Sequence, residues 1–203
     1  MGQFAAPYAI SGEAYPGAVP ASGRGVVPRY VALLGSINVG GNRLLMADLR
    51  EALEREEFAD VETVVASGNV LFSHDERPSQ GLAEKLAHAV RERFGIDTFA
   101  AVRSKEELKS AIEDNPFAKD GEHRFVHTIF LSDKLDRAAF DAFAKSYDGP
   151  ERLAAGNQEF YVDFVEGVGQ SKLDPAMRKA KVIKCRATAR NLRSLQRILE
   201  KMG

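Results

Sequence analysis

Two patterns of hydrophobic residues alternate along the chain, one typical of β-strands and the other typical of amphipathic helices. A short apolar run from Val31 to Leu34 is typical of a buried strand, and from Met46 the apolar residues recur at near-helical spacing. Residues 60–73 contain two β-rich runs split by a Ser-Gly-Asn sequence, which indicates a hairpin. The pattern therefore predicts strand, helix, strand and strand in this order.

A second helix and a fourth strand follow the hairpin. The apolar residues from Ser79 onward form one stripe that ends at Gly95, and residues 97–102 are β-rich. The first half therefore has the order β-α-β-β-α-β of a ferredoxin-like unit. Ser104 and Glu107 then predict a capping box for another helix, which we expect to stop before the proline that follows Asn115.

The second half repeats this order in outline. Residues 124–132 predict a strand, residues 135–146 a helix, and residues 151–164 a pair of strands. We expect a final helix over residues 189–201, with Thr188 as its N-cap. The predicted fold class is α+β, with two ferredoxin-like halves that come from an internal duplication.

These patterns divide the chain into three parts. Residues 1–28 are rich in Ala, Gly and Pro and follow neither pattern, so we expect a loose extension. The polar run after Phe117 is the predicted boundary between a first half, residues 29–117, and a second half, residues 118–203, with a basic C-terminal helix.

Composition excludes several classes of protein. The hydrophobic fraction of 44% and the charged fraction of 28% are ordinary for a globular chain. The single cysteine, Cys185, excludes an internal disulfide framework, and no signal peptide or membrane span is evident, so we expect a cytoplasmic protein without a membrane partner. His123 and His127 lack a third ligand nearby, and we expect neither a metal nor a cofactor.

Charge is distributed unevenly along the chain. Residues 172–203 have a net charge of +8, whereas the whole chain has −1, so residues 1–171 carry −9. A positive C-terminal surface suits phosphate groups or a nucleic-acid backbone. The alternative is that these basic side chains pair with the acidic first half inside one fold or form a solvated helix face.

Three segments carry the candidate chemistry. Gly40 and Gly41 allow backbone N–H groups to face an anion, although the same loop also suits an ordinary tight turn. Residues 167–172 combine flexible backbone with a hydroxyl and an ammonium group. An arginine in the first turn of the last helix works against the helix dipole, and either a bound anion or a carboxylate elsewhere in the chain would explain it. The candidate ligand-binding residues are Asn38, Gly40, Gly41, Asn42, Ser67, Asn69, Ser171, Lys172, Arg190 and Asn191, and no catalytic residue is identified.

Five motifs together resemble a known family. LLGSINVGGN at 33–42, ASGNVLF at 66–72, NPF at 115–117, GVGQSKL at 167–173 and ATARN at 187–191 have the order and spacing of the bacterial domain of unknown function 1697. The resemblance implies a small soluble bacterial protein with two interlocked ferredoxin-like halves and no established activity. Gly35 and Ser36 replace the Arg-Gly pair that is usual in the family, so Arg43 or Arg190 would have to substitute for that arginine in a site. Leu192 also stands where members commonly carry Trp.

We therefore expect a binding protein or enzyme for a small phosphorylated or otherwise anionic ligand, such as a nucleotide, where the three segments converge. One alternative is a nucleic-acid-binding module that uses the basic C-terminal region, with Phe160, Tyr161 and Phe164 as the candidate aromatics that stack on bases. Another alternative is an interaction or assembly domain without a small ligand. The sequence leaves open the reaction, the identity of the ligand and the oligomeric state.

Overall fold

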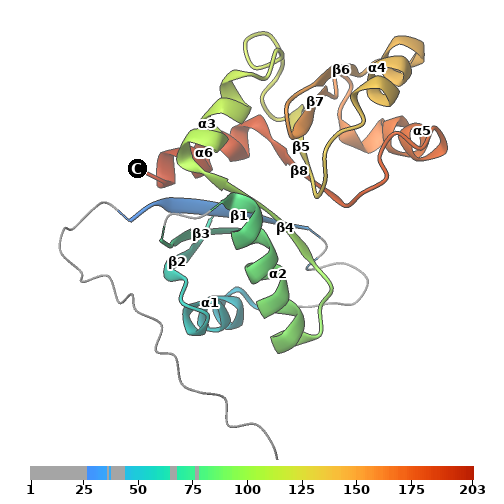
Figure 1. Ribbon diagram of the computed structural model, residues 1–203. Coiled ribbons are helices and arrows are strands. Elements are labelled where there is room, and N and C mark those ends of the chain that lie inside the picture. The colour runs from blue at the N-terminus through green and yellow to red at the C-terminus, as the bar shows by residue number, and fades with distance from the viewer. Residues whose placement is uncertain (1–26, 36, 38–43, 65–67, 76–77) are drawn as a thin grey trace, which may run out of the picture.

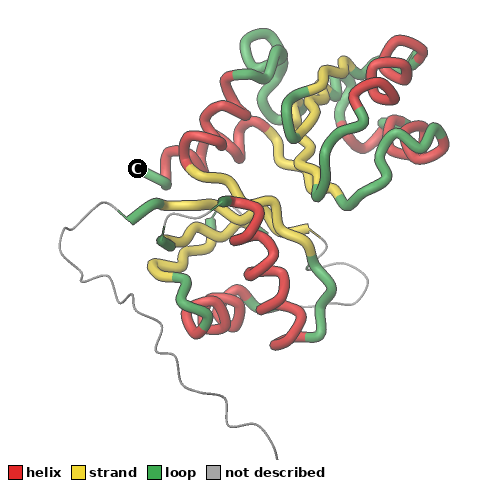
Figure 2. The backbone as a smooth tube through the Cα atoms, in the orientation of Figure 1, coloured by secondary structure: helices red, strands yellow, loops and turns green. Residues whose placement is uncertain are grey.

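The chain folds into two four-stranded antiparallel sheets with helices on both faces of each (Figures 1 and 2). This computed structural model describes residues 27–35, 37, 44–64, 68–75 and 78–203. The fold class is therefore α+β, as predicted. No helix in these ranges is long and apolar enough to cross a membrane.

The first sheet contains the four strands predicted for the first half. They are β1 (Arg29–Gly35), β2 (Ala59–Thr63), β3 (Asn69–Ser73) and β4 (Phe99–Ser104), in the order β2-β3-β1-β4. Helices α1 (Met46–Arg55) and α2 (Ser79–Phe94) bury one face of this sheet. Gly95 ends α2 in the left-handed conformation, with φ of 65°, as its position after the apolar stripe predicts.

The predicted capping box is confirmed at the start of α3 (Lys105–Glu113). Ser104 Oγ accepts a hydrogen bond from the Glu107 N–H at 3.2 Å, and the Glu107 carboxylate accepts from the Ser104 N–H at 2.8 Å. Beyond the helix, Asn115 Oδ1 accepts from the Phe117 N–H at 3.0 Å. This side chain therefore shapes the turn that the Asn-Pro sequence predicts.

The second sheet has the same strand order as the first. Its strands are β5 (Val126–Leu131), β6 (Arg152–Ala155), β7 (Glu159–Asp163) and β8 (Ala187–Asn191), in the order β6-β7-β5-β8. Helices α4 (Arg137–Ser146) and α5 (Leu173–Lys179) lie on its outer face, and a 3-10 turn, Val168–Gln170, precedes α5.

The end of the chain corrects two predictions. The last helix, α6, spans Leu192–Lys201, and its N-cap is Asn191, whose Oδ1 accepts from the Ser194 N–H at 2.8 Å. Thr188, the predicted N-cap, lies instead within β8. Residues 187–191 pair antiparallel with β5, so this long-range pairing outweighs the local cap signal. The sequence reading also missed α5.

Helices α3 and α6 lie between the two sheets (Figure 1). One buried apolar cluster joins Leu33 and Phe99 of the first sheet to Leu108 of α3, Leu195 of α6 and Phe130 of β5. Because burial of apolar surface is the main driving force of folding, this shared cluster holds the two sheets in one body.

Candidate functional site

The structure separates the predicted site residues into two groups. Asn69 and Arg190 contact each other where the two sheets meet. Ser171 and Lys172 lie just before α5 on the outer face of the second sheet. The remaining candidates in the first loop and the first hairpin, Asn38, Gly40, Gly41, Asn42 and Ser67, lie outside the described residues.

Arg190 donates from all five of its N–H groups, and three of these hydrogen bonds reach across to the first sheet and its hairpin. A guanidinium has five donors in a planar fork, so none is left without an acceptor. The acceptors are all uncharged oxygens: Asn69 Oδ1 at 2.5 Å, the Gly68 and Leu34 carbonyls at 2.9 and 3.0 Å, Thr188 Oγ1 at 2.7 Å and the Ala189 carbonyl at 2.8 Å. We call this group of residues the Arg190 corner.

No described carboxylate forms an ion pair with Arg190. Burial lowers the pKa of its guanidinium to about 10, because removal from water disfavours the charged form. The group is still protonated at neutral pH. The Arg190 corner therefore contains a largely desolvated positive charge without a negative partner among the residues that the structure describes.

Arg103 occupies the corresponding position in the first half. Each arginine lies on the edge strand of its sheet, directly before a helix N-cap: Ser104 for α3 and Asn191 for α6. The sequence reading did not select Arg103. Its place before the capping-box serine, matched by Arg190 before Asn191, is the signal that would have identified it.

The partner of Arg103 carries a charge. Arg103 Nη2 lies 3.6 Å from Glu159 Oε2, and both side chains are only 8% exposed. The guanidinium also stands over the Phe130 ring, 5.2 Å from its centroid. We call these three residues the Arg103 corner. Here the buried cation has a carboxylate beside it.

Glu159 and Asn69 occupy equivalent places in the two sheets. Glu159 faces Phe130 of β5 in the pairing register, and Asn69 faces Leu33 of β1 in the same way. Asn69 Nδ2 donates to the Val64 carbonyl at 3.1 Å while its Oδ1 accepts from Arg190. A carboxylate lacks the donor for the carbonyl, which explains an amide at this position.

Ser171 is bonded to protein groups on the other side of the second sheet. Its Oγ donates to Glu151 and accepts from the Leu173 N–H at 3.1 Å, and Tyr147 donates to the same carboxylate at 2.7 Å. Burial pushes the pKa of Glu151 up, but the bonds from Ser171 and Tyr147 outweigh it and hold the pKa below its ordinary value. Lys172 is exposed. Neither side chain belongs to the Arg190 corner.

The start of α6 is not open to a ligand in the way the sequence suggested. Asn191 Oδ1 accepts from the Ser194 N–H, and the Arg193 N–H donates to the His123 carbonyl at 3.3 Å. These two bonds use donors of the first turn that would otherwise face an anion. Because the helix begins three residues later than predicted, the Arg190 side chain extends from a strand.

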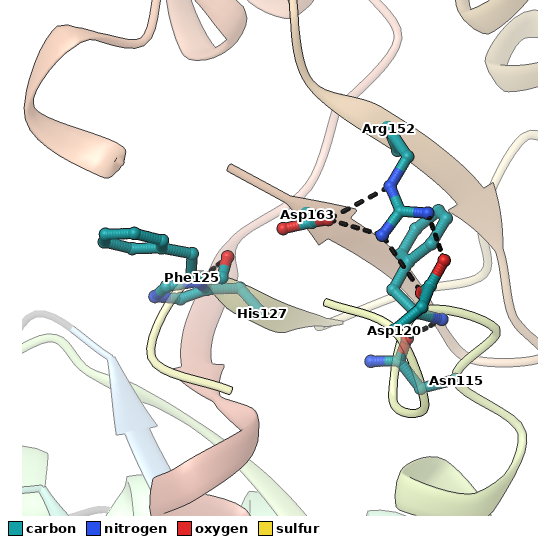
Figure 3. A network of polar contacts seen from close by, with 7 residues as sticks. Asn115, Asp120, Phe125, His127, Arg152 and Asp163 are labelled. Atoms are coloured by element: carbon teal, nitrogen blue, oxygen red, sulfur yellow. Dashed lines mark hydrogen bonds and ion pairs between the residues drawn. The ribbon is translucent and has the colours of Figure 1, made fainter. Parts of the chain in front are cut away.

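Another arginine shows the opposite electrostatic situation (Figure 3). Arg152 donates two hydrogen bonds to Asp120, at 2.8 and 3.1 Å, and two to Asp163, at 2.6 and 3.0 Å. Its guanidinium lies over the Phe117 ring, 4.7 Å from the centroid. The hydrogen bonds from Arg152 lower the pKa of Asp120. This network holds Asp120, in the segment after α3, against the second sheet. No local sequence pattern predicts the network.

The histidines considered as metal ligands make other contacts. His127 Nδ1 is 2.9 Å from the Phe125 carbonyl (Figure 3), and burial lowers the pKa of the ring. His123 Nδ1 is 3.1 Å from Gln196 Oε1. Within the described ranges, no group of three or more His, Cys, Asp or Glu side chains is arranged to hold a metal ion.

The aromatic and basic groups proposed for nucleic acid are largely engaged in the fold. Phe160 and Tyr161 are only 3% and 1% exposed, so they are not available to stack on bases. Basic residues near the C-terminus pair with the acidic first half: Arg186 with Asp97 at 3.1 Å, and Lys201 with Glu62 at 4.0 Å. These contacts agree with the alternative in which the charge asymmetry is resolved inside one fold.

Comparison with known proteins adds a family and a related fold. The chain is similar to the structure of a conserved bacterial protein from Streptococcus pneumoniae, with a TM-score of 0.66 and 22% sequence identity over 86% of this chain and 98% of that chain. At this identity the likeness concerns the fold alone. No curated protein matches the chain. A family model described as "Protein of unknown function (DUF1697)" matches residues 27–161, and the chain therefore belongs to the DUF1697 family.

Proposed function

We propose that this protein binds a small anionic ligand, phosphorylated or carboxylated, at the Arg190 corner. The observation that carries the proposal is the Arg190 charge, which is desolvated and has only neutral oxygens around it. A charge in such surroundings is costly unless a counter-charge lies nearby. A bound anion supplies that counter-charge.

Arg190 contributes mainly its positive charge in this proposal, because its five N–H groups already donate to the protein. The ligand oxygens need donors from elsewhere. The glycine- and asparagine-rich loop at residues 38–42 and Ser67 are the proposed source of backbone and side-chain donors. The described neighbours of both segments support this placement, since Leu34 near the end of β1 and Gly68 both accept hydrogen bonds from Arg190.

We also infer that the two halves, residues 29–117 and 118–203, are ferredoxin-like units that come from an internal duplication. The identical strand orders support this inference. The matched positions of Arg103 and Arg190 before helix N-caps are a second support. On this view, one duplicated arginine retained a carboxylate partner, and the other became available to attract a ligand.

A thermal-shift experiment tests the proposed binding. Inorganic phosphate, ATP and a single-stranded oligonucleotide are each added at constant ionic strength, which removes general screening as a cause. A ligand at 100 times its Kd stabilises the folded state by about 2.7 kcal/mol. We expect phosphate or ATP to raise the Tm of the wild type.

Three variants locate the effect. Arg190→Gln removes the charge and is expected to abolish the Tm shift, whereas Arg190→Lys keeps the charge and retains part of it. Lys172→Ala removes an exposed charge on the other face of the second sheet and serves as the matched control, with a full shift. A full shift in Arg190→Gln, or no shift in the wild type with either anion, contradicts the proposal. A shift with the oligonucleotide alone that disappears in salt favours nucleic-acid binding.

A further inference from the structure

An apolar pocket of about 520 Å³ lies on the outer face of the second sheet. Its lining includes Ile129 and Phe160 from the sheet, Met177 from α5, Cys185, and Ala187 and Ala189 from β8. Small-molecule sites typically have 300–1,000 Å³ and mostly apolar walls. The size and the lining of this pocket both fall within that description.

The pocket exists because the edge strand β8 lacks the cover that its counterpart has. In the first half, the sixteen residues of α2 pack over the sheet, and Ala32, Ala100 and Val102 are 0%, 6% and 1% exposed. In the second half, α5 has only seven residues.

The corresponding positions of the second sheet are open as a result. The pairing registers match Ile129 with Ala32, Ala187 with Ala100 and Ala189 with Val102. Ile129 is only half-buried, and both alanines are exposed. The second sheet therefore presents to the pocket an apolar surface that the first sheet hides under a helix.

The rim of the pocket is positively charged. Residues 172–186 contain six basic side chains and one acidic side chain, Asp174. Two of the basic side chains, Arg178 and Arg186, line the pocket. Their ion pairs with Asp174 and Asp97 join side chains that are all more than half exposed. Exposed pairs of this kind contribute little, so an anionic group of a ligand can replace them.

We propose that this pocket binds a small amphipathic anion, with an apolar body the size of a medium-chain acyl group and a single carboxylate or comparable group. The apolar body lies against Ile129, Met177 and the two alanines of β8, and the anionic group meets Arg178 and Arg186. This site is distinct from the Arg190 side chain, because successive side chains of a strand point to opposite faces and Ala189 precedes Arg190. Thr188 is the residue that the pocket lining and the Arg190 corner share.

Decanoate, below its micellar concentration, is the probe for the full chain. Its binding is followed by displacement of the fluorescent dye 8-anilinonaphthalene-1-sulfonate, which itself has an apolar body and an anionic group. Decanol and decyltrimethylammonium test the charge requirement. We expect saturable displacement by decanoate, at least tenfold weaker displacement by decanol, and none by the cationic amphiphile. Equal displacement by all three would overturn the anionic part of the proposal.

Ala189→Phe places a ring in the pocket from an exposed position and is expected to weaken decanoate binding at least tenfold. Ala138→Phe adds the same ring to an exposed position on α4 and is the control, with unchanged binding. The double variant Arg178→Gln, Arg186→Gln should weaken decanoate binding without affecting decanol. Unchanged decanoate binding in both the Ala189 variant and the double variant would overturn the site.

Cys185 provides an independent readout, because it is the single thiol of the chain and lines the pocket. The rate at which a thiol-specific disulfide reagent modifies it should fall at least fivefold as decanoate saturates the protein. Phosphate at concentrations that saturate the Arg190 corner should not change that rate. An unchanged rate with decanoate would place the bound molecule elsewhere and overturn the assignment, whatever the outcome at Arg190.

Discussion

The two halves share an order of elements but differ at two matched places. In the first half, α2 covers the edge strand β4, and Arg103 from that strand meets the carboxylate of Glu159. In the second half, the short α5 leaves β8 open, and Arg190 meets the amide of Asn69. One edge strand is thus closed and charge-balanced, whereas the other is open and positive. We therefore expect a ligand to bind at the second edge strand, β8, and not at β4.

The largest expected effect comes from loss of the Arg190 side chain. Arg190→Met removes three hydrogen bonds that link the two sheets, to the Leu34 and Gly68 carbonyls and to Asn69 Oδ1. Asn69 Oδ1 is then left without a donor, whereas the Gly68 carbonyl keeps the Leu34 N–H and the Leu34 carbonyl keeps the Thr188 hydroxyl. We expect the free energy of unfolding to fall by about 3–5 kcal/mol, since three hydrogen bonds from a charged donor are lost at once and one buried acceptor is left unsatisfied. Urea denaturation measures the change, and a loss below about 1 kcal/mol would mean that these bonds do not hold the corner.

A smaller effect is expected at the matched position of the other corner. Glu159→Gln preserves the shape of the side chain but leaves the Arg103 charge without its carboxylate. The free energy of unfolding should fall by about 2–3 kcal/mol, because breaking a buried pair leaves one charge uncompensated.

The double variant Arg103→Leu, Glu159→Leu is the control for this effect. It should lie closer to the wild type than Glu159→Gln does, because apolar residues can replace a buried pair at little cost. Equal stability of Glu159→Gln and the wild type in urea would show that charge balance is not what distinguishes the two corners.

The smallest expected effect concerns pH. His127 of β5 corresponds to Tyr30 of β1, and burial lowers the pKa of His127. Its folded-state pKa lies below the unfolded value of about 6.5, so the unfolded chain binds the proton more readily in this range. The wild type should therefore lose stability as pH falls below about 6.5, and His127→Phe should lose less. Parallel urea curves at pH 7.5 and 5.5 that show identical losses would contradict this assignment.

The periodic first half shows what a sequence can predict. The capping box at Ser104 and the helix stop at Gly95 depend on nearby residues, and the structure confirms both. Residues 187–191 were placed wrongly because their strand conformation depends on pairing with β5, which is distant in sequence. The contact of Arg190 with Asn69 spans 121 residues, so a local pattern has no means to predict its geometry.

For the candidate site, too, the sequence predicts which residue types are present, whereas the topology decides which of them meet. The sequence predicts Asn69 of the Ser-Gly-Asn turn and Arg190 as site residues, and the structure brings these two side chains together. Ser171 and Lys172 were selected for their chemistry, but the topology places them on the other face of the second sheet. Helix α5 is short and contains Pro175, so it offers little helical periodicity, and the pocket beside it could not be read from the chain.

The most direct test is nuclear magnetic resonance of the arginine Nε–H groups during a phosphate titration at constant ionic strength. The signals of Arg190 and Arg103 are assigned by their loss in Arg190→Lys and Arg103→Lys. If Arg190 attracts an anion because its charge lacks a partner, its signal should shift saturably while that of Arg103, beside Glu159, stays in place. A stationary Arg190 signal, or equal shifts of the two, would contradict the account.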